Sequence, residues 1–121
     1  MIPDSSTTAI MASNSISSSP VYSRLAEDPV LGELVDLFAQ EMPNRINTLE
    51  VQAKSRDWSQ LARTAHQLKG AAGSYGFDAI TPSAARLEFA ARDAQQEETI
   101  LLAFDELLSL CRRVCGGTPR A

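Results

Sequence analysis

Apolar residues recur at spacings of three and four along most of the chain, which is the period of an amphipathic helix. A first helix is predicted to start at Asp28-Pro29, because Asp suits the cap position and Pro the first helical position. Pro43 falls inside this helix and predicts a kink rather than an end, since the apolar pattern continues across it. The apolar positions of this helix are Leu31, Leu34, Phe38, Met42, Ile46, Leu49 and Ala53.

Three more helices follow in the same pattern. Asp57 is the predicted cap of the second, and Gly76 either closes it or allows the next helix to pack tightly. The third carries Pro82 in its first turn, where proline is tolerated. The predicted buried positions of these three helices are Trp58, Leu61, Ala65, Leu68, Ala72 and Tyr75; Ile80, Ala84, Leu87 and Ala91; and Leu101, Phe104, Leu108, Cys111 and Cys115.

Four amphipathic helices with short connections and no strand pattern predict an all-α fold, an antiparallel up-down four-helix bundle over residues 21–115. A short extra N-terminal helix is expected from Val21 to about Glu27. Residues 1–20 are rich in Ser and Thr and lack a periodic apolar surface, so we expect a disordered tail there. Residues 116–121 form a short C-terminal tail. The initial Met and the short tails favour a free-standing protein.

Composition narrows the function classes. A length of 121 residues fits one domain. The net charge of −4 and the few aromatic residues argue against nucleic-acid binding. No apolar run could span a membrane, and the first basic residue is Arg24, which argues against a secretory signal. Cys111 and Cys115 lie four apart, as apolar residues of one helix face would, which favours a reducing, cytoplasmic location.

His66 is the only histidine in the sequence, and a lysine and several small residues lie close to it along the predicted helix. On a helix it lies roughly 130° from the centre of the buried stripe, so it should face solvent. Lys69 lies between His66 and the core, and Ala62, Gly70 and Gly73 surround the imidazole. The two glycines cost the helix ~2 kcal/mol relative to alanine. Their missing Cβ atoms would let another group approach His66 closely.

Each of these features also has an ordinary interpretation. An exposed histidine is commonly just solvated, Lys69 is then a surface charge, and glycines permit helix contact. The combination favours a functional site. A metal site is disfavoured because two thiols and one distant histidine are too few ligands. An ATP site is not expected, because Lys69 precedes its glycine and no strand leads into it, unlike a P-loop.

The segment from His66 to Phe77 reads HQLKGAAGSYGF. It resembles the His-x-Leu-Lys-Gly motif of the histidine-containing phosphotransfer (HPt) domain of multistep two-component relays. The resemblance extends over about residues 28–115 and includes Asp57-Trp58 and Leu87-Glu88. It implies a four-helix bundle that carries a phosphoryl group and is not itself an enzyme.

The resemblance also implies roles for single residues. His66 would accept a phosphoryl group from the aspartyl phosphate of a response-regulator receiver domain and pass it to an aspartate of another receiver, with a hybrid histidine kinase upstream. Lys69 would oppose charging of the imidazole and stabilise the phosphoryl oxygens. Glu88 occupies the place of a residue that accepts the Nδ1 proton and leaves Nε2 as the nucleophile. Otherwise Glu88 is a solvated carboxylate on a helix face.

Receiver contacts are expected around His66 on the same helix. No metal cage is recognisable, so the Mg²⁺ that phosphoryl transfer needs should come from the receiver. We expect a monomer. Two alternatives stay open, namely the phosphotransfer domain of a chemotaxis-type histidine kinase and a helical adaptor that is never phosphorylated. The candidate docking residues are Ala62, Arg63, Gln67, Gly70, Gly73 and Ser74, of which Arg63 and Gln67 have a plain surface role as the competing interpretation.

Overall fold

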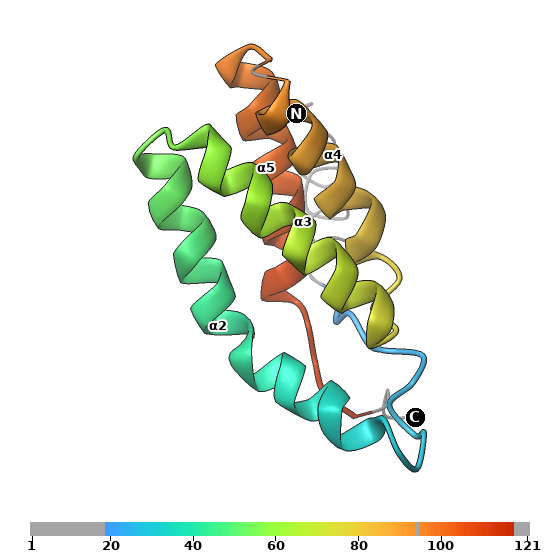
Figure 1. Cartoon of the computed structure of the whole chain (residues 1–121). Helices are drawn as coiled ribbons and strands as arrows, with labels where there is room; N and C mark the ends of the chain where they lie inside the picture. The colour runs from blue at the N-terminus through green and yellow to red at the C-terminus, as the bar shows by residue number, and fades with distance from the viewer. Residues whose placement is uncertain (1–18, 94, 118–121) are drawn as a thin grey trace, which may run out of the picture.

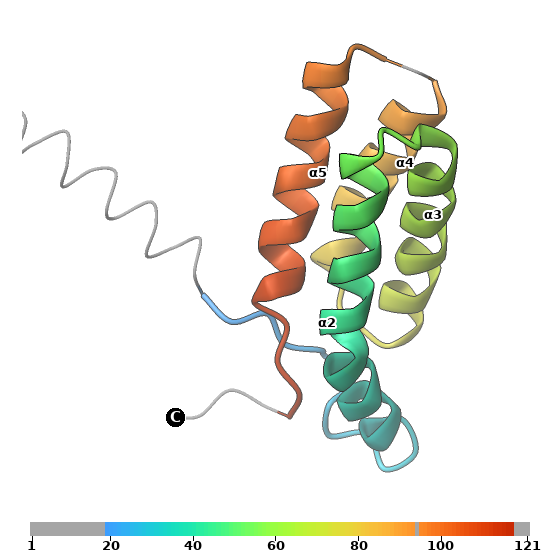
Figure 2. The same cartoon turned by 90° about the vertical axis from the view of Figure 1, so that its left-hand side faces the viewer.

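Four antiparallel helices make up the part of the chain that the structure describes (Figure 1). The computed structural model describes residues 19–93 and 95–117. In these residues no strand is present, and successive helices contact one another, with the last also contacting the first. Figure 2 shows this closed bundle from the side. The predicted all-α up-down bundle is therefore confirmed, with helices α2 (Gly32–Lys54), α3 (Trp58–Ser74), α4 (Ile80–Arg92) and α5 (Glu97–Arg112).

The predicted start of α2 at Asp28-Pro29 is wrong, because residues 29–31 form a turn and the N-cap residue of the helix, Leu31, has no side-chain capping bond. The Oδ1 atom of Asp28 accepts hydrogen bonds from the backbone N–H groups of Val30 and Leu31, each at 2.8 Å. These bonds favour the ionised carboxyl and lower the pKa of Asp28. Regular helix begins at Gly32 and continues through Pro43, and the ribbon changes direction in the turquoise part of α2 (Figure 1). The proline therefore bends the helix and does not end it.

The predicted helix from Val21 to Glu27 is wrong. Residues 24–27 form a turn, and Val21 makes an isolated parallel bridge with Val114. The N–H of Val21 donates to the Arg113 carbonyl at 2.7 Å, and the N–H of Cys115 donates to the Val21 carbonyl at 2.9 Å. The backbone groups that a helix would have paired locally are bonded to the C-terminal flank instead. The predicted tail residues 1–18 and 118–121 lie outside the described residues.

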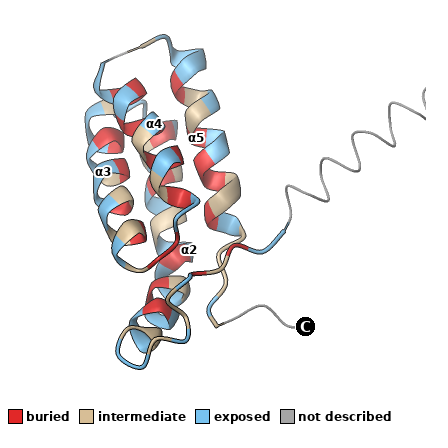
Figure 3. Ribbon diagram, turned by 90° about the vertical axis from the view of Figure 1, so that its right-hand side faces the viewer, coloured by how far each residue is buried: buried red, intermediate tan, exposed pale blue. Residues whose placement is uncertain are grey.

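Buried residues line the inner faces of the four helices (Figure 3). Most predicted core positions are buried, but Leu34 is 40% exposed while its neighbour Val35 is fully buried. Both residues continue a spacing of three or four towards Phe38, so the pattern could not choose between them. Cys115 lies beyond the end of α5 and is only half-buried, because its segment runs beside Val21. The pattern also missed other buried residues, among them Phe77, Ile100 and Leu107.

The two ends of α3 are set by local signals. Asp57 Oδ1 accepts the N–H of Gln60 at 3.2 Å, as its capping role predicts. Gly76 follows the helix with φ of +80°, a left-handed conformation that favours glycine. A Cβ atom there would lie 2.7 Å from Ser23 Oγ and 2.9 Å from Leu25 Cγ. Gly76 thus terminates α3 and lets the N-terminal flank pack against it. No described helix is long and apolar enough to cross a membrane.

Candidate functional site

His66 lies on the outer face of α3. Its side chain is 60% exposed, whereas Leu61 and Ala65 on the opposite face are fully buried. This is the orientation that the helical period predicts, because residues on one helix recur at about 100° per position. The α3 backbone therefore holds the imidazole firmly while leaving it open to a partner.

A buried carboxylate on α4 contacts the Nδ1 atom of the imidazole. The side chain of Glu88 is only 6% exposed, and its Oε2 atom lies 2.8 Å from His66 Nδ1. An ionised carboxylate can only accept hydrogen bonds, so the proton of this contact belongs to Nδ1. In the neutral form of the ring, the second nitrogen, Nε2, then carries a free lone pair. The structure thus places Glu88 in the contact that orients an imidazole and fixes its tautomer.

Two cations hold the same carboxylate. Lys69 Nζ, one helical turn after His66, donates to Glu88 Oε1 at 2.8 Å. Arg92, one turn after Glu88 on α4, donates through Nη2 to Glu88 Oε2. The Lys69 bond lowers the pKa of Glu88 most, and His66 and Arg92 act in the same direction, against the effect of burial. Glu88 is therefore ionised at neutral pH despite being buried.

Sequence reasoning missed Arg92. A Glu and an Arg four residues apart on one helix commonly pair on the surface, so the spacing of Glu88 and Arg92 was the available signal. That signal is weak by itself, because most such pairs have no link to a functional site. Arg92 gains its place here because Glu88 also contacts His66 on the neighbouring helix.

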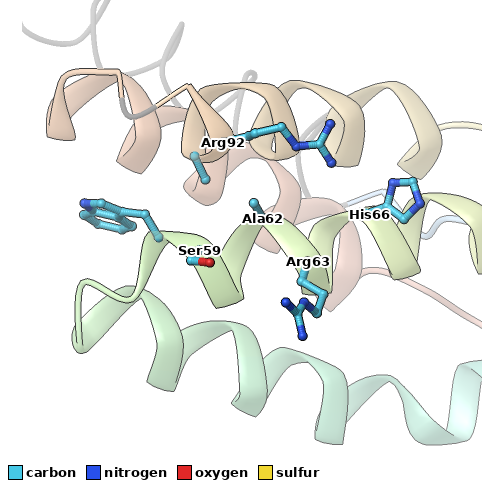
Figure 4. Close-up of a pocket in the computed structure, with 7 residues that line it drawn as sticks. Ser59, Ala62, Arg63, His66 and Arg92 are labelled. Atoms are coloured by element: carbon cyan, nitrogen blue, oxygen red, sulfur yellow. The ribbon is translucent and has the colours of Figure 1, made fainter.

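An open hollow of about 510 Å³ adjoins the imidazole (Figure 4). Its lining includes two arginines and no acidic residue, although the chain as a whole has a net charge of −4. Figure 4 shows the Arg92 side chain extending from α4 towards His66, while Arg63 points to the other side of α3. The hollow therefore offers a positively charged surface beside the imidazole of His66. It is lined by Trp58, Ser59, Ala62, Arg63, His66, Ala91 and Arg92.

The two glycines near His66 face different surroundings. A Cβ atom on Gly70 would have no heavy atom within 4 Å, so this glycine leaves open space. A Cβ atom on Gly73 would lie 3.6 Å from Thr81 Oγ1, at the start of α4. We expected both glycines on the open surface around His66, and for Gly73 this is a correction. The first turn of α4 lies beside the last turn of α3 and half-covers Gly73.

The other candidate docking residues differ in exposure. Arg63, Gln67 and Ser74 are exposed on α3. Ala62 is only 6% exposed, although it forms part of the wall of the hollow. The structure therefore leaves three polar side chains and Gly70 accessible around His66, with Ala62 as a small residue at the base of the hollow.

The thiols lie apart from this site. Cys111 is buried on α5, and burial raises its pKa to about 12, so it is protonated at neutral pH and a poor nucleophile. Across residues 19–93 and 95–117, no group of three or more His, Cys, Asp or Glu residues is arranged to hold a metal ion.

An exposed imidazole backed by a buried carboxylate on a four-helix bundle defines a class of protein, the histidine phosphotransfer domains. The family model of the Hpt domain matches residues 33–114, which is more than half of the chain. The chain therefore belongs to the Hpt domain family. Comparisons with curated proteins and with solved structures gave no match. Hpt domains carry phosphoryl groups in two-component phosphorelays, where they interact with receiver domains and kinases.

Proposed function

We propose that His66 is the phosphoacceptor of this Hpt domain. It takes a phosphoryl group from the aspartyl phosphate of one receiver and passes the group to an aspartate of another. The single observation that supports this role best is the pairing of His66 Nδ1 with the buried Glu88 carboxylate at 2.8 Å, while 60% of the imidazole side chain stays exposed. The ring is held in one tautomer and still reachable by a partner protein.

The transfer step follows from that tautomer. The Nε2 lone pair attacks the phosphorus atom and forms the N–P bond, while the P–O bond to the receiver aspartate breaks and its carboxylate leaves with the electron pair. No proton has to move, because Nδ1 keeps its hydrogen. The imidazole ring becomes positively charged as the N–P bond forms, and the Glu88 carboxylate stabilises that developing charge.

In this proposal, Lys69 and Mg²⁺ together offset the negative charge of the transferred phosphoryl group. One N–H of the Lys69 ammonium bonds Glu88, which leaves two donors for phosphoryl oxygens. We propose that the receiver provides the Mg²⁺ ion, since phosphoryl transfer depends on such an ion to neutralise charge.

The proposal also covers the compartment, the oligomeric state and the upstream partner of the protein. We propose that the protein acts as a monomeric carrier in the cytoplasm, without binding ATP, and that a hybrid histidine kinase supplies the upstream phosphoryl group. The inert, buried Cys111 thiol fits a reducing compartment.

Radiolabelled receivers test the proposal. Incubation with a panel of ³²P-phosphorylated receivers and Mg²⁺ should give a label on this chain that is labile to acid and stable to alkali, and a second receiver should then remove it. Absence of label from every receiver would contradict the relay role. Labelling by a separate kinase domain and ATP, with no receiver present, would instead support the chemotaxis-type alternative.

Gly70→Ala should separate docking from chemistry. The new methyl group has open space, so the variant should gain about 0.8–1 kcal/mol in free energy of unfolding from better helix propensity. The same methyl should hold a receiver away from His66 and slow transfer by about tenfold, because a misplacement of ~1 Å strongly reduces rates. Urea unfolding and quenched transfer assays measure the two effects.

Phosphoramidate is the control for this variant. This small donor phosphorylates imidazole directly and needs no protein docking, so its rate should be the same with Gly70→Ala as with the native chain. A native transfer rate from the receiver to Gly70→Ala would show that Gly70 does not clear space for docking.

A further inference from the structure

We propose that an apolar groove between α4 and α5 binds a segment of the same chain, residues 9–12. The groove is an open hollow of about 460 Å³, lined by residues of both helices and of the connection between them. It lies apart from the hollow beside His66, with which it shares no lining residue. The proposal therefore does not depend on the role of His66 in phosphoryl transfer.

The groove has an apolar surface. An aromatic ring, that of Phe89, stands in it with 59% of the residue exposed. The charged residue of the lining, Arg86, already pairs with Glu106 of α5 at 2.9 Å. A large exposed ring beside small apolar residues is typical of a surface that binds another apolar group. The small residues of the lining are Ala85, Ala90 and Ala103.

The N-terminal segment has the matching composition. Residues 5–18 contain no charged residue, and within them residues 9–12 read AIMA, a run of four apolar residues. Burying the side chains of Ile10 and Met11 against alanine and phenylalanine removes apolar surface from water. No charge has to be desolvated when this segment enters the groove.

The described part of the chain begins beside the end of α5 and points along it. Arg113 Nη1 donates to the Ser19 carbonyl at 3.0 Å, next to the lower end of α5 (Figure 2). Val21 forms a parallel bridge with Val114. Because the two segments are parallel, the chain followed back from Val21 runs in the same direction as α5 followed back from Val114. That direction leads towards the groove.

The distance to the groove fits residues 9–12. Ala103 and Thr99 precede Arg113, the C-cap of α5, by ten and fourteen residues, which is about 15 and 21 Å along the helix axis. An extended chain covers ~3.3 Å per residue, so Met11 can lie up to about 26 Å from Ser19. Ile16 can lie only about 10 Å from Ser19, which is short of both groove residues.

Tethering favours the chain's own segment over a second copy. A segment joined to its site by a short linker acts at an effective concentration in the millimolar range. Residues 13–18 are such a linker between residues 9–12 and the described chain. A second copy would have to bind from its much lower bulk concentration, so the tethered segment occupies the groove first.

Photo-crosslinking from the groove tests the proposal on the full chain. Phe89→p-benzoylphenylalanine places a benzophenone at an exposed position. On illumination its ketone carbon bonds to a carbon of the neighbouring residue, and the ketone oxygen takes that carbon's hydrogen. Trypsin should then release residues 87–92 joined to residues 1–24, because Arg24 is the first basic residue.

Mixed isotopes identify the occupant. In a mixture of ¹⁵N-labelled and unlabelled chains, each crosslinked product should carry one isotope only, because both peptides come from one chain. Products that join a labelled peptide to an unlabelled one would show a second copy in the groove and would overturn the proposal. Absence of any crosslink to residues 1–24 would overturn it as well.

Ile10→Asp combined with Met11→Asp should lower the crosslink yield by about tenfold or more, because an unpaired carboxylate is costly to bury. Ile16→Asp is the matched control. It makes the same chemical change outside the reach of the groove, so the yield should stay within about twofold of that without it. Equal yields with the double substitution and with Ile16→Asp would exclude residues 9–12 as the bound segment.

Amide ¹H–¹⁵N spectra check the contact without the benzophenone. The double substitution at Ile10 and Met11 should move the signals of Thr99 and Ala103 and leave that of His66 in place. Unchanged signals for Thr99 and Ala103 would contradict docking in the groove.

Discussion

His66→Gln should abolish phosphorylation of the protein by both receivers and phosphoramidate. Glutamine is similar in size and can donate its amide N–H to Glu88, but it has no nucleophilic lone pair on nitrogen. The side chain is exposed, so the free energy of unfolding should stay within about 0.5 kcal/mol of the native value. Acid-labile label on intact protein measures the first effect, and urea unfolding followed by circular dichroism measures the second.

The chain provides its own control for this variant. No other histidine exists in the sequence, so a second imidazole cannot take over. Gln67→Ala, next to His66 and also exposed, should keep its label. Acid-labile label that persists on the His66→Gln variant would place the phosphoryl group on another type of residue and would contradict the assignment.

Glu88→Gln should slow phosphoryl transfer by about 100-fold, because rates fall steeply when a reacting group loses its orientation. The amide can still accept a hydrogen bond from Nδ1, but it has no negative charge to offset the positive ring. It also leaves Lys69 and Arg92 without their shared counter-charge. Single-turnover transfer measures the rate, and ¹⁵N spectra of the imidazole show whether the ring still favours the tautomer with the proton on Nδ1.

Glu106→Gln is the control for a lost carboxylate. Glu106 is 55% exposed and pairs with Arg86 on the α4–α5 side of the bundle, so its loss should leave transfer unchanged. Equal transfer rates and equal spectra for the two Gln variants would exclude both the orienting and the electrostatic role of Glu88.

Glu88→Gln also tests how the stability of the fold depends on acid pH. In the folded protein the pKa of Glu88 is lowered from its ordinary value of 4.5, chiefly by Lys69. The unfolded chain therefore binds this proton more readily than the folded one. The stabilisation by Glu88 is fully present above pH 4.5 and is lost as the pH falls through the lower folded value. The native chain should thus lose more free energy of unfolding on acidification than Glu88→Gln. Parallel pH profiles would contradict this.

Much of the fold and part of the site follow from local sequence. The cap Asp57 forms the predicted hydrogen bond, because a capping side chain contacts N–H groups only two or three residues away. Asp28 makes bonds of the same short range, but in the turn before α2. The exposure of His66 follows from the helical period on one helix. Where two adjacent apolar residues both fit the period, as with Leu34 and Val35, the sequence leaves the choice of buried residue open.

The sequence by itself determined four helices, their buried faces, and an exposed imidazole with a lysine one turn away. The tertiary structure decided which groups meet across helices. His66 and Glu88 are 22 residues apart, and their contact depends on the register in which α4 packs along α3. The same packing brings Arg92 to the site and turns Gly73 towards Thr81. A periodic pattern encodes which side of a helix is buried, whereas the register between helices comes from side-chain packing that acts only once the chain is folded.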